Sequence, residues 1–323
     1  MIKAPRRALL ASALALPFIQ RAHAQTPWPD RPVRIIIPFG AGGPIDLVGR
    51  LLAEHLKERL GQPFIIENRP GAGGSIGIHT VVQSPPDGTA FVLTSASLAS
   101  VPALYPNRGL DPRTALAPVS LVADIPTAMV VRAASPYQSV QEVLAAARAE
   151  PGRLTYGSGG VGSSNHLSGA LFALAANLDL THVSYRGAAP AHIDLAGGRV
   201  HMIFDNIPQA LALARDGKVR ALAVTGAQRS PQAPEIPALA EFLPGFDISS
   251  WGGVCAPAGI SPALIRRINE LTKQSLDSED IKKRFYDNGA TTWYTTPEEF
   301  VKFRADNEAA FAPLIRASGA KVD

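Results

Sequence analysis

A serine inside a glycine-rich turn is the first candidate for chemistry in this sequence. Gly73-Gly74-Ser75-Ile76-Gly77 has the G-x-S-x-G pattern in which a serine acts as the nucleophile of a hydrolase. That motif needs the serine on a sharp turn directly after a strand, whereas residues 68–74 separate Ser75 from the strand expected at 64–67. A serine hydrolase using Ser75 therefore stays as an alternative function. The histidines that follow have no spacing that selects one as a general base: His79, His166, His182, His192 and His201.

A second glycine motif could bind a nucleotide. Gly157-x-Gly159-x-x-Gly162 lies between an expected strand and an expected helix, as the dinucleotide-binding fingerprint does. The fingerprint also requires an acidic residue at the end of the next strand, where this chain has Tyr185 and Arg186. Because an arginine there suits the 2′-phosphate of a nicotinamide cofactor, a nucleotide-dependent oxidoreductase is a second alternative.

A third turn favours the binding of an anion. "RIIIPFGAGGPID" runs from Arg34 to Asp46 as an apolar strand, a glycine turn and a helix that begins at Pro44. Proline suits the first helical position, and the free amides and dipole of a helix N-terminus attract negative charge. The Gly-Lys-Ser/Thr ending of a phosphate-binding loop is absent. The turn therefore either binds a small anion or only connects the two elements.

The histidines and the cysteine of the sequence do not indicate a metal site or a disulfide bond. No two histidines have i, i+4 spacing, and Cys255 is the only cysteine. A single cysteine builds neither a thiolate metal site nor an intramolecular disulfide, and a buried, apolar role is expected for it. We therefore expect no metal ion and no cofactor.

The first 24 residues predict export. "MIKAPRRALLASALALPFIQRAHAQ" has a basic start, an apolar run from Ala8 to Ile19 and Ala22-His23-Ala24 before Gln25, the order of a signal peptide cleaved after Ala24. The apolar run has 12 residues, too few for the roughly 20 of a spanning helix. Removing the four basic residues of this segment leaves a formal net charge of zero, so no nucleic-acid partner is expected. Nicotinamide cofactors are scarce outside the cytoplasm, which weighs against the oxidoreductase.

Strands and helices alternate along the rest of the chain. Apolar strands that alternate with amphipathic helices predict mostly parallel sheets covered on both faces. We expect an α/β protein of two lobes: 25–126 with 250–323 as the first, and 127–249 as the second, inserted lobe. Strands are expected at 33–39, 64–67, 90–94, 119–131, 154–156, 181–185, 200–204, 219–225 and 249–259, and helices at 44–60, 76–83, 139–150, 165–177, 190–196 and 208–215, with two more after Ser261 and Thr296.

Six turns follow the expected strands. Ligands of open α/β sheets bind beyond the carboxyl ends of the strands. If the lobes face each other, all six turns line one cleft, and binding without chemistry accounts for them with the fewest assumptions. The turns are 39–43, 71–75, 95–97 with Ser95 and Ser97, 157–163, 186–190 and 205–206.

Several segments together resemble one family. They are "WPDRPVRIIIPFGAGGPID", "IENRPGAGGSIG", "LAPVSLVADIPTAMVV", "YGSGGVGSSNHLSG", "VSYRGAAPAHIDLAGGRV" and "FDNIPQALALARDGKVRALAVTGAQRS". In order and spacing, from about Trp28 to Gly319, they are similar to the Bug-type substrate-binding receptors of tripartite tricarboxylate transporters. The resemblance implies a periplasmic-binding-protein-like (type II) fold and a small carboxylate held between two lobes.

The resemblance also implies which residues bind the ligand. In that family, backbone amides and ordered water of the first lobe hold the acid group. Asp205 suits a ligand amine, a hydroxyl or a water, or else caps the turn before Pro208. The first-lobe positions are Phe39, Gly40, Ala41, Gly42, Gly43, Gly73, Gly74 and Ser75; the second-lobe positions are Ser158, Gly162, Ser163, Asn165, Tyr185, Arg186, Gly187, Ala188 and Asp205.

One departure from the family bears on the ligand. Pro44 stands where the family usually has serine or threonine, so a hydroxyl and an amide hydrogen are missing. The candidate ligands are C4–C6 dicarboxylates, hydroxy or amino dicarboxylates and aromatic carboxylates. The expected protein is a periplasmic monomer, not an enzyme, that works with two integral membrane components of a transporter. A structural or adhesive secreted protein is the remaining alternative.

Overall fold

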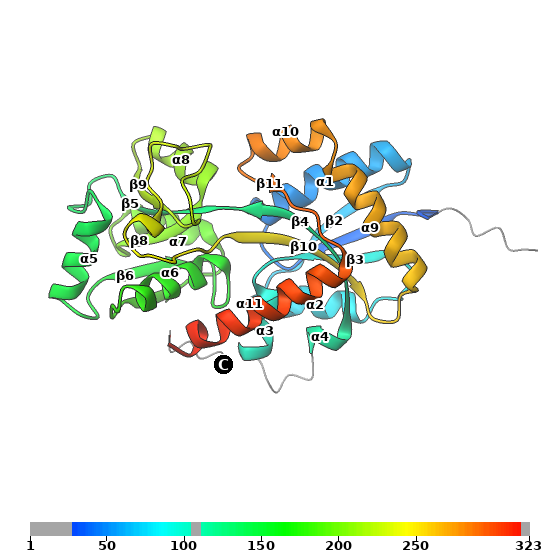
Figure 1. The fold of residues 1–323 in the computed structure, drawn as a ribbon, viewed down its shortest axis with the longest axis horizontal. Helices are drawn as coiled ribbons and strands as arrows, with labels where there is room; N and C mark the ends of the chain where they lie inside the picture. The colour runs from blue at the N-terminus through cyan, green and yellow to red at the C-terminus, as the bar shows by residue number, and fades with distance from the viewer. Residues whose placement is uncertain (1–27, 105–110, 318–323) are drawn as a thin grey trace, which may run out of the picture.

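Two α/β lobes lie side by side, and extended segments of the chain that cross between them connect their sheets (Figure 1). The structure is a computed structural model that describes residues 28–104 and 111–317. The predicted signal peptide lies outside the described residues. Among the described residues, none of the helices combines the length and apolar composition needed to cross a bilayer.

The first lobe is built on a six-stranded sheet. Its β1–β2 and β1–β3 pairs are parallel, whereas β10 runs antiparallel to both β3 and β4. β11 is also antiparallel to β4, so three of the five strand pairs of this sheet are antiparallel and the prediction of a mostly parallel sheet is wrong. The physical reason is that β10 enters from the other lobe in the opposite direction and lies between β3 and β4. In order across the sheet, the strands are β11 (Thr291–Thr292), β4 (Leu116–Ile125), β10 (Ser250–Pro257), β3 (Ala90–Thr94), β1 (Val33–Ile37) and β2 (Phe64–Asn68).

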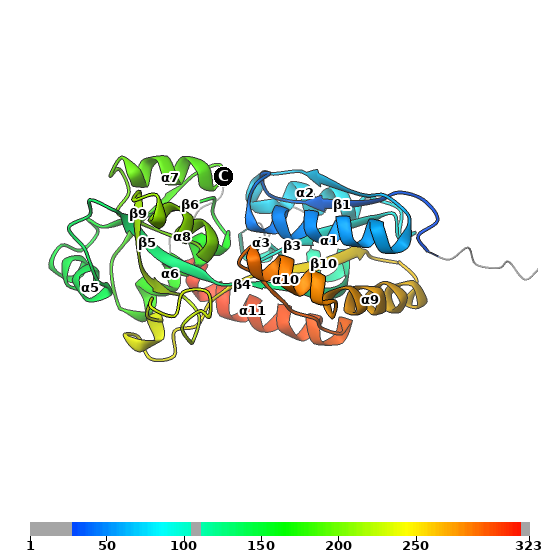
Figure 2. The same ribbon diagram turned by 90° about the horizontal axis from the view of Figure 1, so that it is seen from above.

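Helices cover both faces of this sheet. α1, α9 and α10 pack together on one face, and α2, α3 and α11 lie on the other (Figures 1 and 2). α1 begins at Pro44 and ends where the amide of Gly61, in the left-handed region, donates to Lys57 O. The helices are α1 (Pro44–Leu60), η1 (Ala72–Gly74), α2 (Ser75–Val82), α3 (Ser97–Leu104), α4 (Pro112–Ala115), α9 (Pro262–Leu276), α10 (Glu279–Asp287) and α11 (Pro297–Ala317).

The second lobe repeats the arrangement on a five-stranded sheet. Its β6–β7 and β6–β8 pairs are parallel, and β5, which enters from the first lobe, is antiparallel to β8 and β9. α5 and α6 cover one face, and α7 and α8 the other. The strands in order are β7 (Thr181–Ser184), β6 (Thr155–Ser158), β8 (Met202–Asn206), β5 (Thr127–Arg132) and β9 (Val219–Val224); the helices are α5 (Val140–Ala149), α6 (Ser164–Ala175), α7 (Ala188–Ala196), α8 (Ile207–Arg215) and η2 (Leu239–Glu241).

Two chain segments cross between the lobes. β4 leads into β5 through Pro126, which breaks the extended run as predicted, and the second segment returns through Ser249 into β10. Beside the first crossing, the hydroxyls of Thr127 and Thr225 lie 2.7 Å apart. These two segments connect the two sheets.

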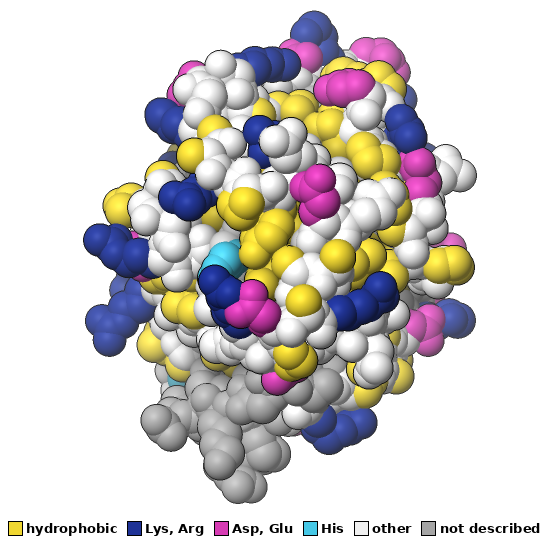
Figure 3. Space-filling view, turned by 90° about the vertical axis from the view of Figure 1, so that its left-hand side faces the viewer, with side chains coloured by type: hydrophobic (Ala, Val, Ile, Leu, Met, Phe, Trp, Pro, Cys, Tyr) yellow, Lys and Arg dark blue, Asp and Glu magenta, His cyan; other side chains and the backbone are white. Residues whose placement is uncertain are grey.

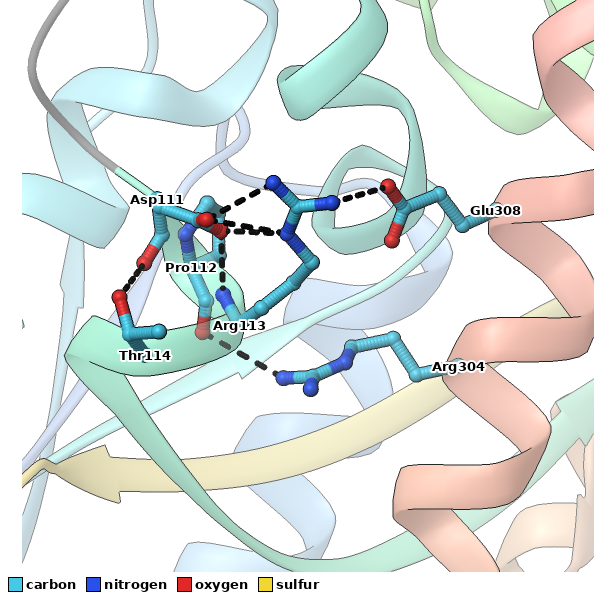
Figure 4. A network of polar contacts seen from close by, with 6 residues as sticks. All are labelled: Asp111, Pro112, Arg113, Thr114, Arg304 and Glu308. Atoms are coloured by element: carbon cyan, nitrogen blue, oxygen red, sulfur yellow. Dashed lines mark hydrogen bonds and ion pairs between the residues drawn. The ribbon is translucent and has the colours of Figure 1, made fainter.

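The C-terminal helix connects the lobes a third time. α11 packs against α3 of the first lobe and α6 of the second (Figures 1 and 2). Arg113 of α4 pairs with Asp111 and with Glu308 of α11, and Arg304 of α11 donates to Pro112 O (Figure 4). One apolar core consequently runs through both lobes.

The predicted helices need three corrections, the first of which is the short α4 (Pro112–Ala115), which was not predicted. The chain ends in three helices rather than two, because α10 follows α9 and buries Ile281 and Phe285 on one side. α3 was not predicted, since Pro102 stands inside it. Packing against α11 stabilises this helix despite the proline.

Candidate functional site

The first turn of the first lobe, residues 39–43, is held by the buried carboxylate of Asp46. Asp46 Oδ2 accepts from the amide of Gly42 at 2.9 Å and from Nε of Arg50 at 2.8 Å. Asp46 Oδ1 accepts from Nδ2 of Asn68 at 2.9 Å, and the same amide group donates to Phe39 O at 3.1 Å. The amide of Gly42 is therefore already hydrogen-bonded to a carboxylate. The amides in the first turn of α1 have no intrahelical acceptor and remain available to bind an anion.

Electrostatics keep this carboxylate ionised. Burial raises the pKa of Asp46, but the hydrogen bonds from Arg50, Gly42 and Asn68 outweigh burial and hold the pKa below its usual range. The nearby positive charge of Arg50 is thus paired within the protein.

The three turns of the first lobe lie against one another. A Cβ on Gly74, whose φ is +95°, would lie 3.0 Å from Ser97 Oγ, and one on Gly77 would lie 2.7 Å from Pro38 Cα. Only glycine permits these approaches. Ser97 Oγ is itself paired with Thr94 Oγ1 at 2.8 Å. The carboxyl ends of β1, β2 and β3 thus form one surface of helix N-termini.

The turns of the second lobe also form one surface. The amide of Gly187 donates to Gly159 O at 3.1 Å, and Nδ2 of Asn165 donates to Phe204 O. These bonds join the turns after β6 and β7 to each other and attach the start of α6 to β8. Ser163 caps α6 by accepting from the amide of His166, and its hydroxyl donates to Gly160 O at 2.7 Å.

Two predicted ligand side chains bond to neighbours in this structure. Asp205, 2 % exposed, accepts from the Asn206 amide at 2.9 Å and lies 2.6 Å from Nε2 of His192. Burial lowers the pKa of His192, but its bond to Asp205 outweighs burial, so the pKa is raised. The Tyr185 hydroxyl donates to Asp194 at 2.7 Å, and burial together with this bond raises the pKa of Tyr185 to about 12. Both side chains stabilise the second lobe, and their contact with a ligand stays a prediction.

The remaining predicted residues differ in exposure. Gly40, Ala41, Gly42 and Arg186 are exposed, whereas Gly74, Ser95, Ser97, Ser158 and Gly162 are buried. The rest are half-buried: Phe39, Gly43, Gly73, Ser75, Ser163, Asn165, Tyr185, Gly187 and Ala188.

α3 and the turn 157–163 meet across the junction between the lobes. Ser100, one helical turn after Ser97, donates from Oγ to Gly162 O at 3.1 Å. A Cβ on Gly162 would lie 2.5 Å from Leu104 Cδ1. Beside the second crossing segment, the hydroxyls of Ser164 and Ser250 lie 2.9 Å apart. The structure thus places α3, which begins at the turn 95–97, against the turn 157–163 of the other lobe. That all six turns line one cleft stays a prediction.

The lobes also touch at a second place, which the sequence did not predict. Nε2 of Gln232 donates to Tyr286 O at 2.7 Å, and a Cβ on Gly289 would lie 1.7 Å from Pro208 Cγ. Gly289 and Pro208 are typical turn and helix-start residues, so the sequence gives no sign that they touch.

The enzymatic alternatives do not match the geometry. Ser75 begins α2 after η1 and donates its amide to Ala72 O, rather than standing on a turn directly after β2. Within residues 28–104 and 111–317, no hydrogen bond joins Ser75 to a histidine. In the same residues no cluster of three or more potential ligands could hold a metal ion.

A separate surface cavity lies at the edge of the second lobe. It has a volume of about 460 Å³ and contains none of the predicted ligand residues. On the end of that lobe, Lys and Arg side chains are interspersed with Asp and Glu (Figure 3). The candidate functional site is at the turns rather than at this cavity, because α1, α2 and α6 begin at these turns and helix N-termini attract negative charge. The cavity is lined by Ala133, Leu211, Ala214, Arg215, Val219, Arg220, Ala221, Gln232, Glu235 and Ile236.

The fold and the facing turns define a two-lobed solute-binding protein. The sequence matches the family described as "Tripartite tricarboxylate transporter family receptor" over residues 48–320. It is 36% identical to Protein BugT of Bordetella pertussis over 298 residues, which cover 91% of each chain. The chain belongs to this receptor family, as the Bug-type resemblance predicted.

Solved structures agree with this assignment. "R. palustris Rpa4515 with adipate" has a TM-score of 0.85 and 34% identity, covering 91% of this chain and 100% of that one. The periplasmic binding protein BugD has a TM-score of 0.82 and 31% identity, covering 91% and 99%. MatC from Rhodopseudomonas palustris with bound malate has a TM-score of 0.80 and 28% identity, covering 89% and 99%. Because this is a family of receptors, the protein is a solute-binding receptor and not an enzyme.

Proposed function

We propose that this receptor captures a small carboxylate between its lobes and delivers it to the two membrane components of a tripartite transporter. The observation that carries the proposal is the contact between Ser100 and Gly162, since it joins α3, which follows the turn 95–97, to the turn 157–163 of the other lobe. The turns of each lobe present helix N-termini, which stabilise negative charge. The adipate and malate bound to two related structures support a carboxylate as the ligand.

Amide groups on opposite lobes suit a ligand with an acid group at each end. A C4–C6 dicarboxylate, with or without a hydroxyl or amino group, meets this requirement, and an aromatic carboxylate is the remaining candidate. Pro44 removes an amide hydrogen from the first turn, which favours a ligand that is less polar at that point.

We further propose the boundaries of the mature protein and its lobes. The signal peptide covers residues 1–24, and the receptor acts in the periplasm as a monomer. The first lobe comprises 25–126 with 250–323, and the second comprises 127–249. The two crossing segments at Pro126 and Ser249 support these limits.

Thermal unfolding of the 25–323 chain tests the ligand class. At one hundred times its dissociation constant, a ligand adds about 2.7 kcal/mol of stability, which raises the melting temperature by several degrees. We expect a shift with adipate, malate or another acid of that class, and none with nucleotides. A flat response to every acid would refute the proposal.

A matched pair of variants locates the site. A Cβ on Gly40 would meet no atom within 4 Å, so Gly40→Asp and Gly40→Asn both fit and differ in charge alone. We expect Gly40→Asp to abolish the shift and Gly40→Asn to keep most of it. If the ligand shifts the melting temperature of both variants equally, the acid group of the ligand does not bind beside Gly40.

A further inference from the structure

Two stacked histidines lie beneath the glycine turn of the second lobe. His166 is in the first turn of α6 and His182 is in β7, and their ring centroids are 4.2 Å apart. Tyr156 of β6 stacks on His182 with a centroid distance of 4.9 Å. His166 is 0% exposed. His166 and Tyr156 are buried in the interior of the lobe, and His182 is half-buried.

Each histidine bonds to one end of the turn. The amide of Gly162 donates to Nδ1 of His166 at 3.2 Å, and Oγ of Ser158 lies 2.7 Å from Nε2 of His182. Because Gly162 is the donor, Nδ1 of His166 carries no proton, and the proton of the neutral ring is on Nε2. The turn is thus held from below by two imidazoles.

The Nε2 atom of His166 is unpaired within the described part of the chain, which indicates that the histidine is present for the hydrogen bond at its other ring nitrogen, Nδ1. Nε2 is buried and has no hydrogen-bond partner among the described residues. A buried, unsatisfied N–H group is costly, and an apolar side chain would avoid the cost. An apolar side chain, however, could not accept the hydrogen bond that the Gly162 amide donates to Nδ1.

The surroundings keep this acceptor available. Burial lowers the pKa of His166 to about 4, and burial together with His166 lowers the pKa of His182 to about 3. The titratable groups that stack on His166 are Tyr156 of β6 and His182 of β7. His166 is therefore neutral at the pH where the receptor works.

Gly162 connects this support to the ligand site. Its φ is +80°, and its carbonyl accepts the bond from Ser100 of the first lobe. The next residue, Ser163, caps α6. A change in the direction of the Gly162 amide would move both the contact between the lobes and the N-terminus of α6.

We propose that His166 is a positioning residue whose neutral Nδ1 holds the Gly162 amide and thereby fixes the turn 157–163 in its ligand-receiving shape. This inference rests on the proposed function, because it concerns the same cleft. His166 acts through Gly162 and touches no ligand.

Two variants of similar polarity test the proposal. The side-chain amide of asparagine reaches the position of Nδ1, so His166→Asn keeps an acceptor for Gly162. Glutamine carries its amide to the position of Nε2, so His166→Gln does not. By calorimetric titration with adipate and malate at pH 7.5, we expect His166→Asn to bind within about threefold of the original protein. We expect His166→Gln to bind roughly 5- to 150-fold more weakly, the range for leaving a buried amide unpaired. Equal affinities of the two variants would overturn the proposal.

A spectroscopic readout does not depend on the ligand. In the original protein, ¹⁵N NMR of the His166 ring should show an unprotonated Nδ1 and a protonated Nε2 from pH 8 to pH 5, and the Gly162 amide should exchange slowly with solvent. A proton on Nδ1, or fast exchange of Gly162, would overturn the proposal even if His166→Gln failed to fold. If no acid binds the original protein, the proposed function fails, and the NMR result still decides the role of His166.

Discussion

Replacing Gly289 with alanine should weaken ligand binding without unfolding the protein. Gly289 lies between α10 and β11 with φ +78°, and its missing Cβ faces Pro208 at the start of α8 in the other lobe. The Cβ of an alanine would lie 1.7 Å from Pro208 Cγ and 2.1 Å from Cδ. Because a proline ring cannot rotate away, the lobes must separate at this point.

The magnitude follows from two separate costs. An alanine in the left-handed region lowers the free energy of unfolding by about 1–2 kcal/mol, whether the lobes are together or apart. The overlap with Pro208 adds about 1–3 kcal/mol, the usual range for overpacking, and only while the lobes are together. The second cost therefore appears as an affinity roughly 5- to 150-fold weaker.

Gly245 offers a matched control for this experiment. Its φ is +81°, and its Cβ would meet no atom within 4 Å. Gly245→Ala should lower the melting temperature about as much as Gly289→Ala and leave the affinity for adipate or malate unchanged. Calorimetric titration measures the affinity, and thermal unfolding measures the stability. If Gly289→Ala binds as tightly as Gly245→Ala, this contact does not belong to the ligand-bound form and the reasoning is wrong.

Three further predictions concern buried groups. Asp46→Ala should lower the free energy of unfolding by about 2 kcal/mol, because the Gly42 amide loses its acceptor; a loss below about 0.5 kcal/mol in urea unfolding would contradict this role. Burial lowers the pKa of His166 to about 4 and that of His182 to about 3, below the roughly 6.5 of an unfolded chain. The unfolded chain then takes up protons first as the pH falls, so stability should decrease from pH 6.5 toward pH 4, by about 3 kcal/mol for His166. Chemical unfolding at several pH values should give a flatter profile for His166→Asn, and parallel profiles would contradict the assignment. Burial raises the pKa of Cys255 to about 12, so a thiol reagent should react with it only after unfolding in urea; rapid reaction with the native protein would contradict its burial.

Elements that depend on local signals could be predicted from the sequence. Pro44 and Gly61 mark the two ends of α1 as expected. The capping box that opens α11 is present, since Thr296 accepts from the amide of Glu299 and Glu299 accepts from that of Thr296. α3 could not be predicted, because its stability comes from packing against α11 and not from its own residues.

The turns of the candidate site could be predicted from the sequence, but the bonds of their side chains could not. The sequence places glycines and helix starts after strands, and the structure has helices that begin at those positions. The sequence does not reveal that the Gly42 amide is taken by Asp46, or that Asp205 is paired with His192. The pairing of Asp205 with His192 joins two elements by their positions in space, so a single sequence carries no signal for it. The bond from Gly42 to Asp46 is local, and an acidic residue in the first turn of a predicted helix is its only signal.

The helix shared by the two lobes has a consequence for measurement. α11 packs against α3 and α6, and ionic and hydrogen bonds that involve Arg113 of α4 and Arg304 of α11 hold it against α4. A helix that packs against both lobes restricts their relative motion more than two crossing strands alone would. Ligand binding should then change the distance between any two points on opposite lobes by a single, reproducible amount. A pair of fluorescent dyes, one on each lobe, would turn this receptor into an optical sensor for the acid it captures.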